Sequence, residues 1–208
     1  MLKEYLEKNY GYNEPIFINE IQLEGINDNA LRQHFKRMLK SGDLVRFDTG
    51  IYYLPKVSRL LKKSYLDPMK VIIRKYIQST TEIYGYFAGV TFANQIGLTT
   101  QMSATLELVT SKESTKGRTV TIGCQTVRLK RSAIAVTSEN AGLLQFLDAV
   151  SWAEKYSELP DTETRILLKN YAKKQNYNQA LLSSVLSSVT GSTAKKLIEW
   201  GIIYEFTS

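Results

Sequence analysis

The chain is poor in the residues that build disulfides, metal sites and many catalytic centres. Its 208 residues include one cysteine, Cys124, and one histidine, His34. A single cysteine forms no internal disulfide, and the two residues together cannot supply a Cys/His metal cluster. The composition therefore excludes a disulfide-rich secreted scaffold and favours a reducing, cytoplasmic location. It also gives no reason to expect a metal or another cofactor.

Long hydrophobic runs are missing as well. No stretch approaches about eighteen uncharged apolar residues, the length that indicates a membrane-spanning helix. The N-terminus, MLKEYLEKNYGYNEP, alternates charged with apolar residues and lacks the continuous apolar segment of a signal peptide. We therefore expect no membrane partner.

No catalytic set can be assembled from the sequence. His34 has no companion cysteine, Ser-x-Gly elbow or acidic dyad at a recognisable spacing, so no triad can be built around it. Cys124 lies beside a predicted hairpin and is interpreted as a half-buried small residue. A nuclease-like site using Glu107, Glu113 and Glu139 is an alternative, but these acids are scattered in the sequence and a two-metal site needs them close together. We predict that the protein is not an enzyme.

Positive charge, in contrast, is abundant and concentrated. The chain has 27 Lys and Arg against 20 Asp and Glu, a formal net charge of +7. Between Asn27 and Lys63 there are nine cations and three acids, so this stretch alone carries 9 − 3 = +6. Such a concentration suits a polyanionic partner such as nucleic acid.

The basic stretch contains a predicted helix followed by a predicted hairpin. The segment ALRQHFKRMLKSG places Leu31, Phe35, Met38 and Leu39 at the i, i+4, i+7, i+8 spacing of one helical stripe. We expect a helix over residues 29–41, with Asn27 or Asp28 as N-cap and Gly42 after its end. Extended runs at 44–47 and 51–54, joined by Asp48-Thr49-Gly50, predict the hairpin.

The elements before this helix complete a recognisable order. Residues 1–8 are predicted to form a short amphipathic helix, residues 16–18 an extended piece, and residues 19–23 a small helix capped by Asn19. Helix, short helix, basic helix and hairpin form the layout of a winged helix-turn-helix, whose longer helix fits the major groove of DNA. A winged helix can also bind only protein, so that alternative stays open.

Side-chain chemistry suggests specific roles within that layout. Arginine pairs with guanine and Asn or Gln with adenine, whereas lysine suits phosphates. The base-reading candidates are Asn29, Arg32, Gln33 and Arg37; the phosphate candidates are Lys36, Lys40 and Arg46; Thr49 and Tyr52 are candidates for backbone contact at the wing.

The remainder predicts a second, mixed domain. We place the boundary after residue 64, giving a winged-helix domain at 1–64 and an α/β domain at 65–208, and an α+β fold overall. The expected helices are 66–78, 87–96, one beginning at 141, 164–174, 179–189 and 193–200. The expected strands, forming a small antiparallel sheet, are 105–110, 120–122, 125–129, 134–136 and 202–206. The C-terminus is thus mostly helical.

Two tracts of the sequence resemble a known family. The wing, SGDLVRFDTGIYYLP, resembles the K-G-x-L-x-R-x-x-x-G-x-Y-Y pattern of the AbiEi-type antitoxins of type IV toxin–antitoxin systems. YGYFAG at 84–89 with NQIGLTTQ at 94–101 is similar to the G-x-x-A-x-N-x-L-G-L-[ST]-T-Q stretch of the uncharacterised DUF6088 group of AbiEi-like proteins. Residues 106–110 and 127–131 fit the same group. The chain departs at Met102-Ser103, where relatives often carry proline, and beyond residue 155 nothing corresponds.

The resemblance implies a function that the residues alone do not give. It implies a DNA-binding antitoxin that represses its own operon at an upstream double-stranded operator and counteracts a nucleotidyltransferase-like toxin. Antitoxins of this kind need not form a stable toxin complex, so the toxin is a direct or an indirect partner, and the protein binds DNA as a monomer or a dimer. From the residues alone, a DNA-binding regulator and a non-catalytic protein-interaction module both remain open. Tyr84, Tyr86 and the loop 97–101 are either a functional surface or turn and core.

Overall fold

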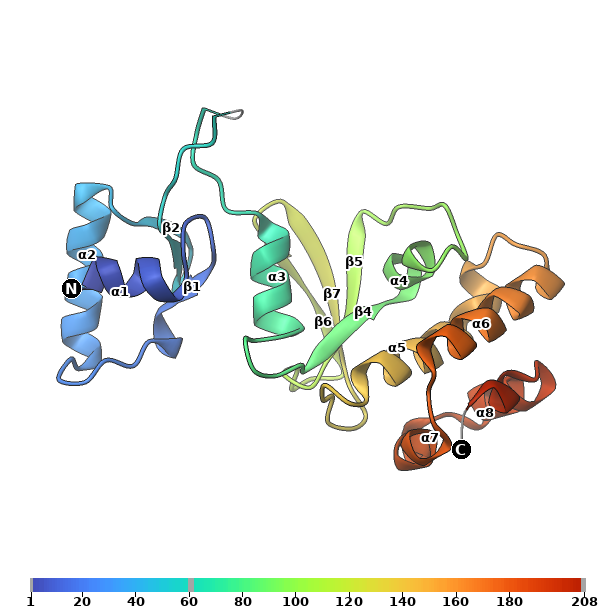
Figure 1. Cartoon of the computed structure of the whole chain (residues 1–208). Helices are drawn as coiled ribbons and strands as arrows, with labels where there is room; N and C mark the ends of the chain where they lie inside the picture. The colour runs from blue at the N-terminus through green and yellow to red at the C-terminus, as the bar shows by residue number, and fades with distance from the viewer. Residues whose placement is uncertain (1, 60–61, 207–208) are drawn as a thin grey trace. The chain divides into compact units, whose positions relative to one another are not determined.

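The computed structural model describes residues 2–59 and 62–206, and the chain divides into two compact units. The N-terminal unit is Met1–Arg74 and the C-terminal unit is Lys75–Ser208. The division falls inside helix α3 (Pro68–Tyr76), later than the expected boundary after residue 64. Figure 1 shows the elements of each unit. The α+β class expected from the sequence is confirmed.

The N-terminal unit has the arrangement of a winged helix-turn-helix. Its elements are α1 (Leu2–Asn9), β1 (Ile16–Phe17), the 3₁₀ helix η1 (Ile18–Glu20), α2 (Asp28–Ser41), β2 (Val45–Asp48) and β3 (Ile51–Tyr53). The strands form an antiparallel sheet in the order β1-β3-β2. The small helix that was predicted at 19–23 is shorter than expected and starts one residue earlier, as the single 3₁₀ turn η1.

One apolar core holds these elements together. Leu6 of α1, Phe35 of α2 and Leu54 after β3 are almost completely buried in it. Phe35 meets Tyr52 edge-on, with ring centroids 5.0 Å apart. Ion pairs Lys70–Glu14 and Arg74–Glu20 (2.8 Å) then attach the first turns of α3 to the same unit.

The C-terminal unit is built on a four-stranded mixed sheet in the order β4-β5-β7-β6. The strands are β4 (Gly85–Ala88), β5 (Thr105–Thr110), β6 (Gly117–Ile122) and β7 (Gln125–Arg131). The hairpin β6–β7 was predicted, although it is longer than expected. Strands β5 and β7 run parallel, which the expected antiparallel sheet did not include.

Helices pack against part of this sheet and against one another, and they complete the second core. They are α4 (Gly89–Gln95), α5 (Ala141–Tyr156), α6 (Asp161–Gln175), α7 (Gln179–Val185), η2 (Leu186–Ser188), α8 (Gly191–Glu199) and η3 (Ile202–Glu205). Helix α5 contributes a broad buried face, with Leu143, Phe146 and Val150 fully enclosed. Within the described ranges, no helix combines the length and the apolar character that a membrane crossing requires.

The predicted helix over 87–96 is partly wrong, because residues 87 and 88 belong to strand β4 and the helix α4 starts after them. Residues 85–88 pair antiparallel with β5, with Gly85 opposite Thr110. A Cβ at Gly85 would lie 2.1 Å from the carbonyl oxygen of Tyr76, so only glycine permits this close backbone approach. The helix proper begins at Gly89, whose φ is +57°. Residues 85–88 are a strand because they pair with β5, which is distant in the sequence. The local sequence of residues 85–88 gives no sign of that partner.

Two predicted strands are also wrong. Residues 134–136 form no strand, because side chains satisfy their backbone: Ser111 Oγ accepts from the amide of Val136 and Asn140 donates to the carbonyl of Ala135. Residues 202–205 form η3 because Gly201, at φ +65°, turns the chain into the helical core. Ile202 is fully buried there. Cys124 is exposed in the β6–β7 turn, not half-buried as expected.

Candidate nucleic-acid interface

Helix α2 is fixed at both ends and along one side. The side chain of Asn27 accepts a hydrogen bond from the amide of Ala30 at 2.9 Å, so Asn27 is the N-cap. Gly42 ends the helix in the left-handed region, with φ of 78°. Leu31 and Phe35 bury the inner side. These local signals were readable in the sequence, and they fix which residues face outward.

The outward side of α2 carries all six residues that the sequence nominated on this helix. Asn29, Gln33, Lys36 and Lys40 follow one another at i, i+4, i+7 and i+11, which places them in one row on a helix. Arg32 and Arg37 flank that row, and all six are exposed. We call this set the α2 polar face: Asn29, Arg32, Gln33, Lys36, Arg37 and Lys40.

The next feature of the α2 polar face is the lack of ion pairs to its cations in the described part of the chain. Among the described residues, no salt bridge involves its four cations. The acid that follows the helix, Asp43, is engaged elsewhere: it accepts hydrogen bonds from Lys3 at 2.7 Å and from Ser41 at 2.6 Å. These bonds lower the pKa of Asp43. The face therefore presents uncompensated positive charge and amide groups to solvent.

The nominated residues of the wing also have contacts within the protein. Arg46 donates through Nε to the carbonyl of Asp48 at 3.2 Å and through Nη2 to Thr49 Oγ1 at 3.1 Å. Arg46 and Thr49 thus brace the turn that Gly50, at φ 73°, completes. The ring of Tyr52 packs against Phe35 and belongs to the edge of the core. Both Arg46 and Thr49 are nevertheless exposed at the wing.

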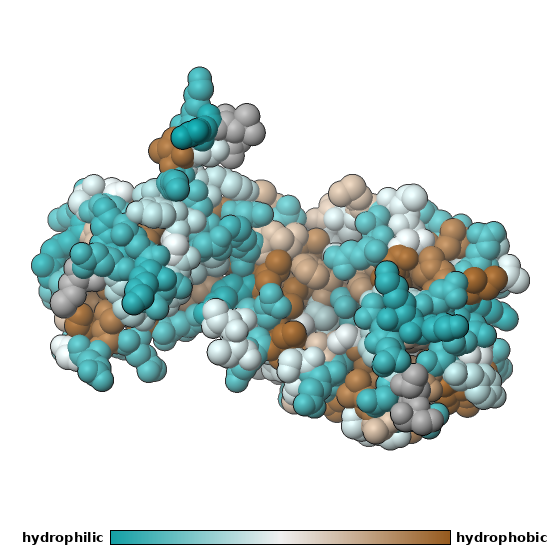
Figure 2. All heavy atoms as spheres, viewed as in Figure 1, coloured by the Kyte–Doolittle hydropathy of each residue, from teal (hydrophilic) through white to brown (hydrophobic). Residues whose placement is uncertain are grey.

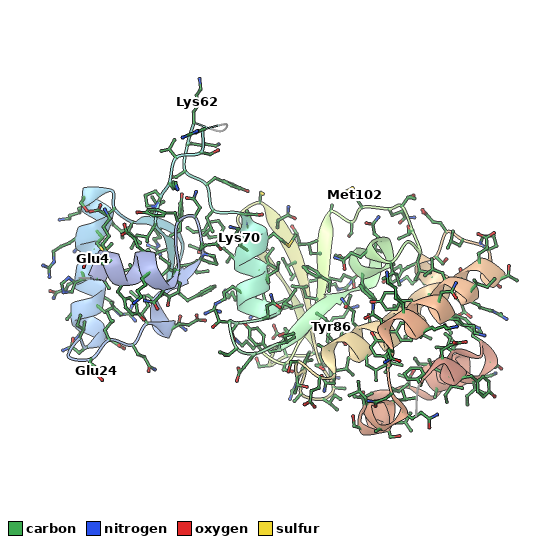
Figure 3. The ribbon with its side chains drawn as sticks, in the orientation of Figure 1. Glu4, Glu24, Lys62, Lys70, Tyr86 and Met102 are labelled. Carbon is green, nitrogen blue, oxygen red and sulfur yellow. The ribbon has the colours of Figure 1, made fainter. Side chains whose placement is uncertain are left out.

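A basic loop follows the wing. Lys56, Arg59, Lys62 and Lys63 are exposed, and Figure 3 shows Lys62 at the tip of the projecting segment between β3 and α3. Asn13 anchors the start of this loop, donating to the carbonyl of Lys56 at 2.9 Å and accepting from its amide at 3.1 Å. Most of the surface of the N-terminal unit seen in Figure 2 is hydrophilic. The loop extends the positive surface beyond α2.

Two of the three carboxylates of the nuclease alternative are paired with different cations. Glu107 lies 2.7 Å from the ammonium group of Lys130, and Glu113 lies 2.8 Å from Nε of Arg118. Glu139 is exposed ahead of α5. Across residues 2–59 and 62–206, no group of three or more His, Cys, Asp and Glu side chains is placed to hold a metal ion.

The loop 97–101, one of the two family-like tracts, is held by a carboxylate. Glu158 accepts from the amide of Thr100 at 2.7 Å, from its hydroxyl at 2.9 Å, and from Gln101 Nε2 at 3.0 Å. These hydrogen bonds, led by the Thr100 amide, lower the pKa of Glu158 to about 2. The loop 97–101 therefore has a structural role, which is one of the two interpretations that the sequence left open.

The fold and this surface define a two-unit α+β protein whose first unit is a winged helix with a basic outer helix. Residues 9–175 match the family described as "Family of unknown function (DUF6088)", and the chain belongs to that family. No curated protein matches the chain.

Proposed function

We propose that the protein is a DNA-binding transcriptional regulator. The observation that carries this proposal is the α2 polar face: four exposed cations, with two amide side chains, on the longer helix of a winged-helix arrangement, without an acidic partner among the described residues. Phosphates supply the missing counter-charge, and Arg, Asn and Gln side chains match the hydrogen-bonding edges of bases in the major groove.

We further propose that it acts as the antitoxin of a type IV toxin–antitoxin system and represses its own operon. Support comes from the likeness of the wing sequence to AbiEi-type antitoxins. In this proposal the N-terminal unit binds the operator. The C-terminal unit counteracts a nucleotidyltransferase-like toxin, directly or indirectly.

A second function is favoured by a different feature. Four large apolar side chains on the C-terminal helices are exposed, and covering them with a partner protein would remove apolar surface from water: Ile166, Leu186, Ile198 and Tyr204. The competing proposal is a non-catalytic interaction module that binds protein through both units and binds no DNA.

A binding assay on the chain's own upstream DNA separates the two functions. We expect specific binding that survives excess competitor DNA, and at least a tenfold loss of affinity in the double variant Arg32→Ala/Arg37→Ala. The matched control, Lys173→Ala/Lys174→Ala, removes two exposed cations from α6 and should bind like the wild type. Absence of wild-type binding, or equal losses in the two variants, would contradict the assignment of α2.

The antitoxin role has its own test. Expression of the neighbouring gene product alone should arrest growth, and co-expression of the full chain should restore it. The Arg32→Ala/Arg37→Ala variant should restore growth equally well while failing to repress the promoter, because toxin neutralisation is assigned to the C-terminal unit. A neighbouring product that does not affect growth would remove the antitoxin proposal and leave the regulator intact.

A further inference from the structure

The C-terminal unit contains a pocket that the DNA-binding proposal does not use. Its volume is about 220 Å³, and its walls come from the end of β7, helix α5 and the start of α8. This location, beyond the carboxyl end of a strand in a parallel pair, is where α/β sheets commonly bind ligands. Part of the wall, residues 188–193, lies outside the segment that matches the family.

One tyrosine that lines this pocket has a hydroxyl group without a hydrogen-bond partner among the described residues. Tyr86 of β4, labelled in Figure 3, is 8% exposed and lines the pocket. Its hydroxyl forms no hydrogen bond with another described residue. Burial, and then the nearby carboxyl of Asp148, raises the pKa of the Tyr86 phenol, so the group stays a donor at neutral pH. An unpaired hydroxyl at the wall of a pocket is a polar group to which a ligand can form a hydrogen bond.

Asp148 of α5 adds an acceptor beside that hydroxyl. Its carboxyl group lines the same pocket, and burial raises its pKa, opposed by the charge of Lys130 and a hydrogen bond from the amide of Gly89. Lys130 also lines the pocket, but its ammonium group is already paired with Glu107 at 2.7 Å. The Tyr86–Asp148 side therefore suits a neutral or cationic hydrogen-bonding group.

The pocket has a second polar region with the opposite preference. Arg131, at the end of β7, is exposed and lines it; one guanidinium nitrogen donates to the carbonyl of Ser114 at a long 3.4 Å. The nine-residue helix α8 begins at the pocket, where Thr190 caps it by accepting from the amide of Thr193. An arginine and a helix N-terminus that line the same pocket each favour an oxyanion as ligand.

We propose that this pocket binds a small molecule carrying an oxyanion group, phosphate or carboxylate, at the Arg131–α8 side and a hydrogen-bonding group at the Tyr86–Asp148 side. Apolar side chains lie among these groups, including Val109, Leu144 and Leu147, and suit an uncharged middle part of the ligand. The volume restricts the ligand to a metabolite-sized molecule. The proposal rests on the C-terminal unit alone and stands or falls independently of DNA binding.

Thermal unfolding of the full chain tests it, because both tryptophans, Trp152 and Trp200, lie in this unit and report on its unfolding. The probes are inorganic phosphate, the ribonucleoside 5′-monophosphates and the standard L-amino acids, each at millimolar concentration. We expect at least one probe to raise the unfolding midpoint by about 2 °C or more. If only the phosphate-containing probes raise the midpoint, the oxyanion is a phosphate. If only the amino acids raise it, the oxyanion is a carboxylate.

Three variants locate the binding. Arg131→Gln should weaken the affinity for the successful probe at least tenfold. Tyr86→Phe keeps the ring and removes one hydrogen bond, so a loss of about two- to tenfold is expected. Lys174→Gln, an exposed cation of α6 away from the pocket, should change nothing. If Tyr86→Phe does not fold, Arg131→Gln decides alone. No shift with any probe, or a shift undiminished by Arg131→Gln, would overturn the proposal.

Discussion

The cations of the α2 polar face differ from many other cations of this protein in having no acid paired with them. The N-terminal unit has ion pairs of its own, Lys3–Asp43, Lys70–Glu14 and Arg74–Glu20, but none of them involves this face. In the N-terminal unit, the four cations of the α2 polar face are exposed and take part in no ion pair among the described residues. In the C-terminal unit, lysine and arginine side chains pair repeatedly with acids: Arg118–Glu113, Lys130–Glu107, Lys169–Glu205, Lys195–Glu199 and Lys196–Glu154.

This difference explains why the positive potential is concentrated on one part of the protein surface. A cation with an acid beside it has its charge largely compensated locally, whereas a row of cations without acids makes a lasting positive field. The excess of six positive charges between Asn27 and Lys63 is therefore available to an external polyanion. In the C-terminal unit five cations are paired with acids, whereas others, including Arg131 at the pocket and Lys173 and Lys174 on α6, take part in no ion pair among the described residues.

The largest effect is expected from removing the centre of one core. Phe35 is 1% exposed, so Phe35→Ala should lower the free energy of unfolding of the N-terminal unit by about 3–5 kcal/mol. Hydrogen exchange should lose protection in residues 2–59, while tryptophan fluorescence, which reports only the C-terminal unit, should stay unchanged. The mirror variant Phe146→Ala should give the reverse. Loss of protection in both units from either variant would show a single cooperative body.

An intermediate effect is expected at a buried carboxylate of the C-terminal unit. Glu113 accepts from Arg118 Nε at 2.8 Å, from the Thr115 amide at 3.0 Å and from the Thr115 hydroxyl at 2.9 Å. These bonds, led by the one from Arg118, lower the pKa of Glu113 to about 2 from 4.5. Because hydrogen bonds to a charged group contribute about 1.5–3 kcal/mol, Glu113→Gln should destabilise this unit by about 2–3 kcal/mol at pH 7.

The same carboxylate gives the variant a pH signature. Because the pKa of Glu113 is lower in the folded state, its ionised carboxylate stabilises the folded unit. This stabilisation is fully present above the unfolded pKa of 4.5 and is lost as the pH falls through about 2. The urea midpoint, followed by tryptophan fluorescence, should therefore fall less between pH 5 and pH 2 (roughly the window of that titration) in Glu113→Gln than in the wild type. Glu139→Gln, an exposed carboxylate of the same unit, should match the wild type. Identical slopes for all three proteins would contradict this assignment.

The smallest effect is expected at the start of α2. Asn27→Ala removes the N-cap and should cost about 1 kcal/mol of stability, seen as faster hydrogen exchange in the first turn of the helix. DNA affinity should fall with it, because Asn29 lies in that turn and Arg32 directly follows it. Asn178→Ala removes the equivalent cap of α7, where Asn178 accepts from the Leu181 amide at 2.6 Å, and should leave DNA affinity unchanged. If Asn27→Ala and the wild type bound DNA with equal affinity, the N-cap of α2 would have no role in DNA binding, and this prediction would be wrong.

The two units also differ in how far the sequence predicts them. In the N-terminal unit the informative signals are local: Asn27 caps, Gly42 terminates, and the stripe from Leu31 to Leu39 selects the buried side of α2. Each lies within a few residues of the structure that it specifies. The predicted helix and hairpin therefore agree with the structure to within one or two residues, and the outward residues of α2 followed from the same stripe.

In the C-terminal unit the decisive contacts are distant in sequence. Strand β4 exists because residues 85–88 pair with β5, and β5 in turn lies parallel to β7. No periodicity within 85–88 or 202–205 reports those neighbours. The pocket is still less accessible to prediction, because it joins Tyr86, Arg131, Asp148 and Thr190 from four separate segments. The tyrosine-rich tract at 84–86 was the one signal that pointed toward it.

The salt dependence of DNA affinity tests the central claim, that the cations of the α2 polar face engage phosphates. If about six phosphates are contacted, log K should fall with log salt concentration at a slope near −5 for the wild type. Lys36→Ala/Lys40→Ala should bring that slope closer to zero by about 2. The control Lys173→Ala/Lys174→Ala should keep the wild-type slope. A wild-type slope near zero, or a slope that Lys36→Ala/Lys40→Ala leaves unchanged, would contradict the account.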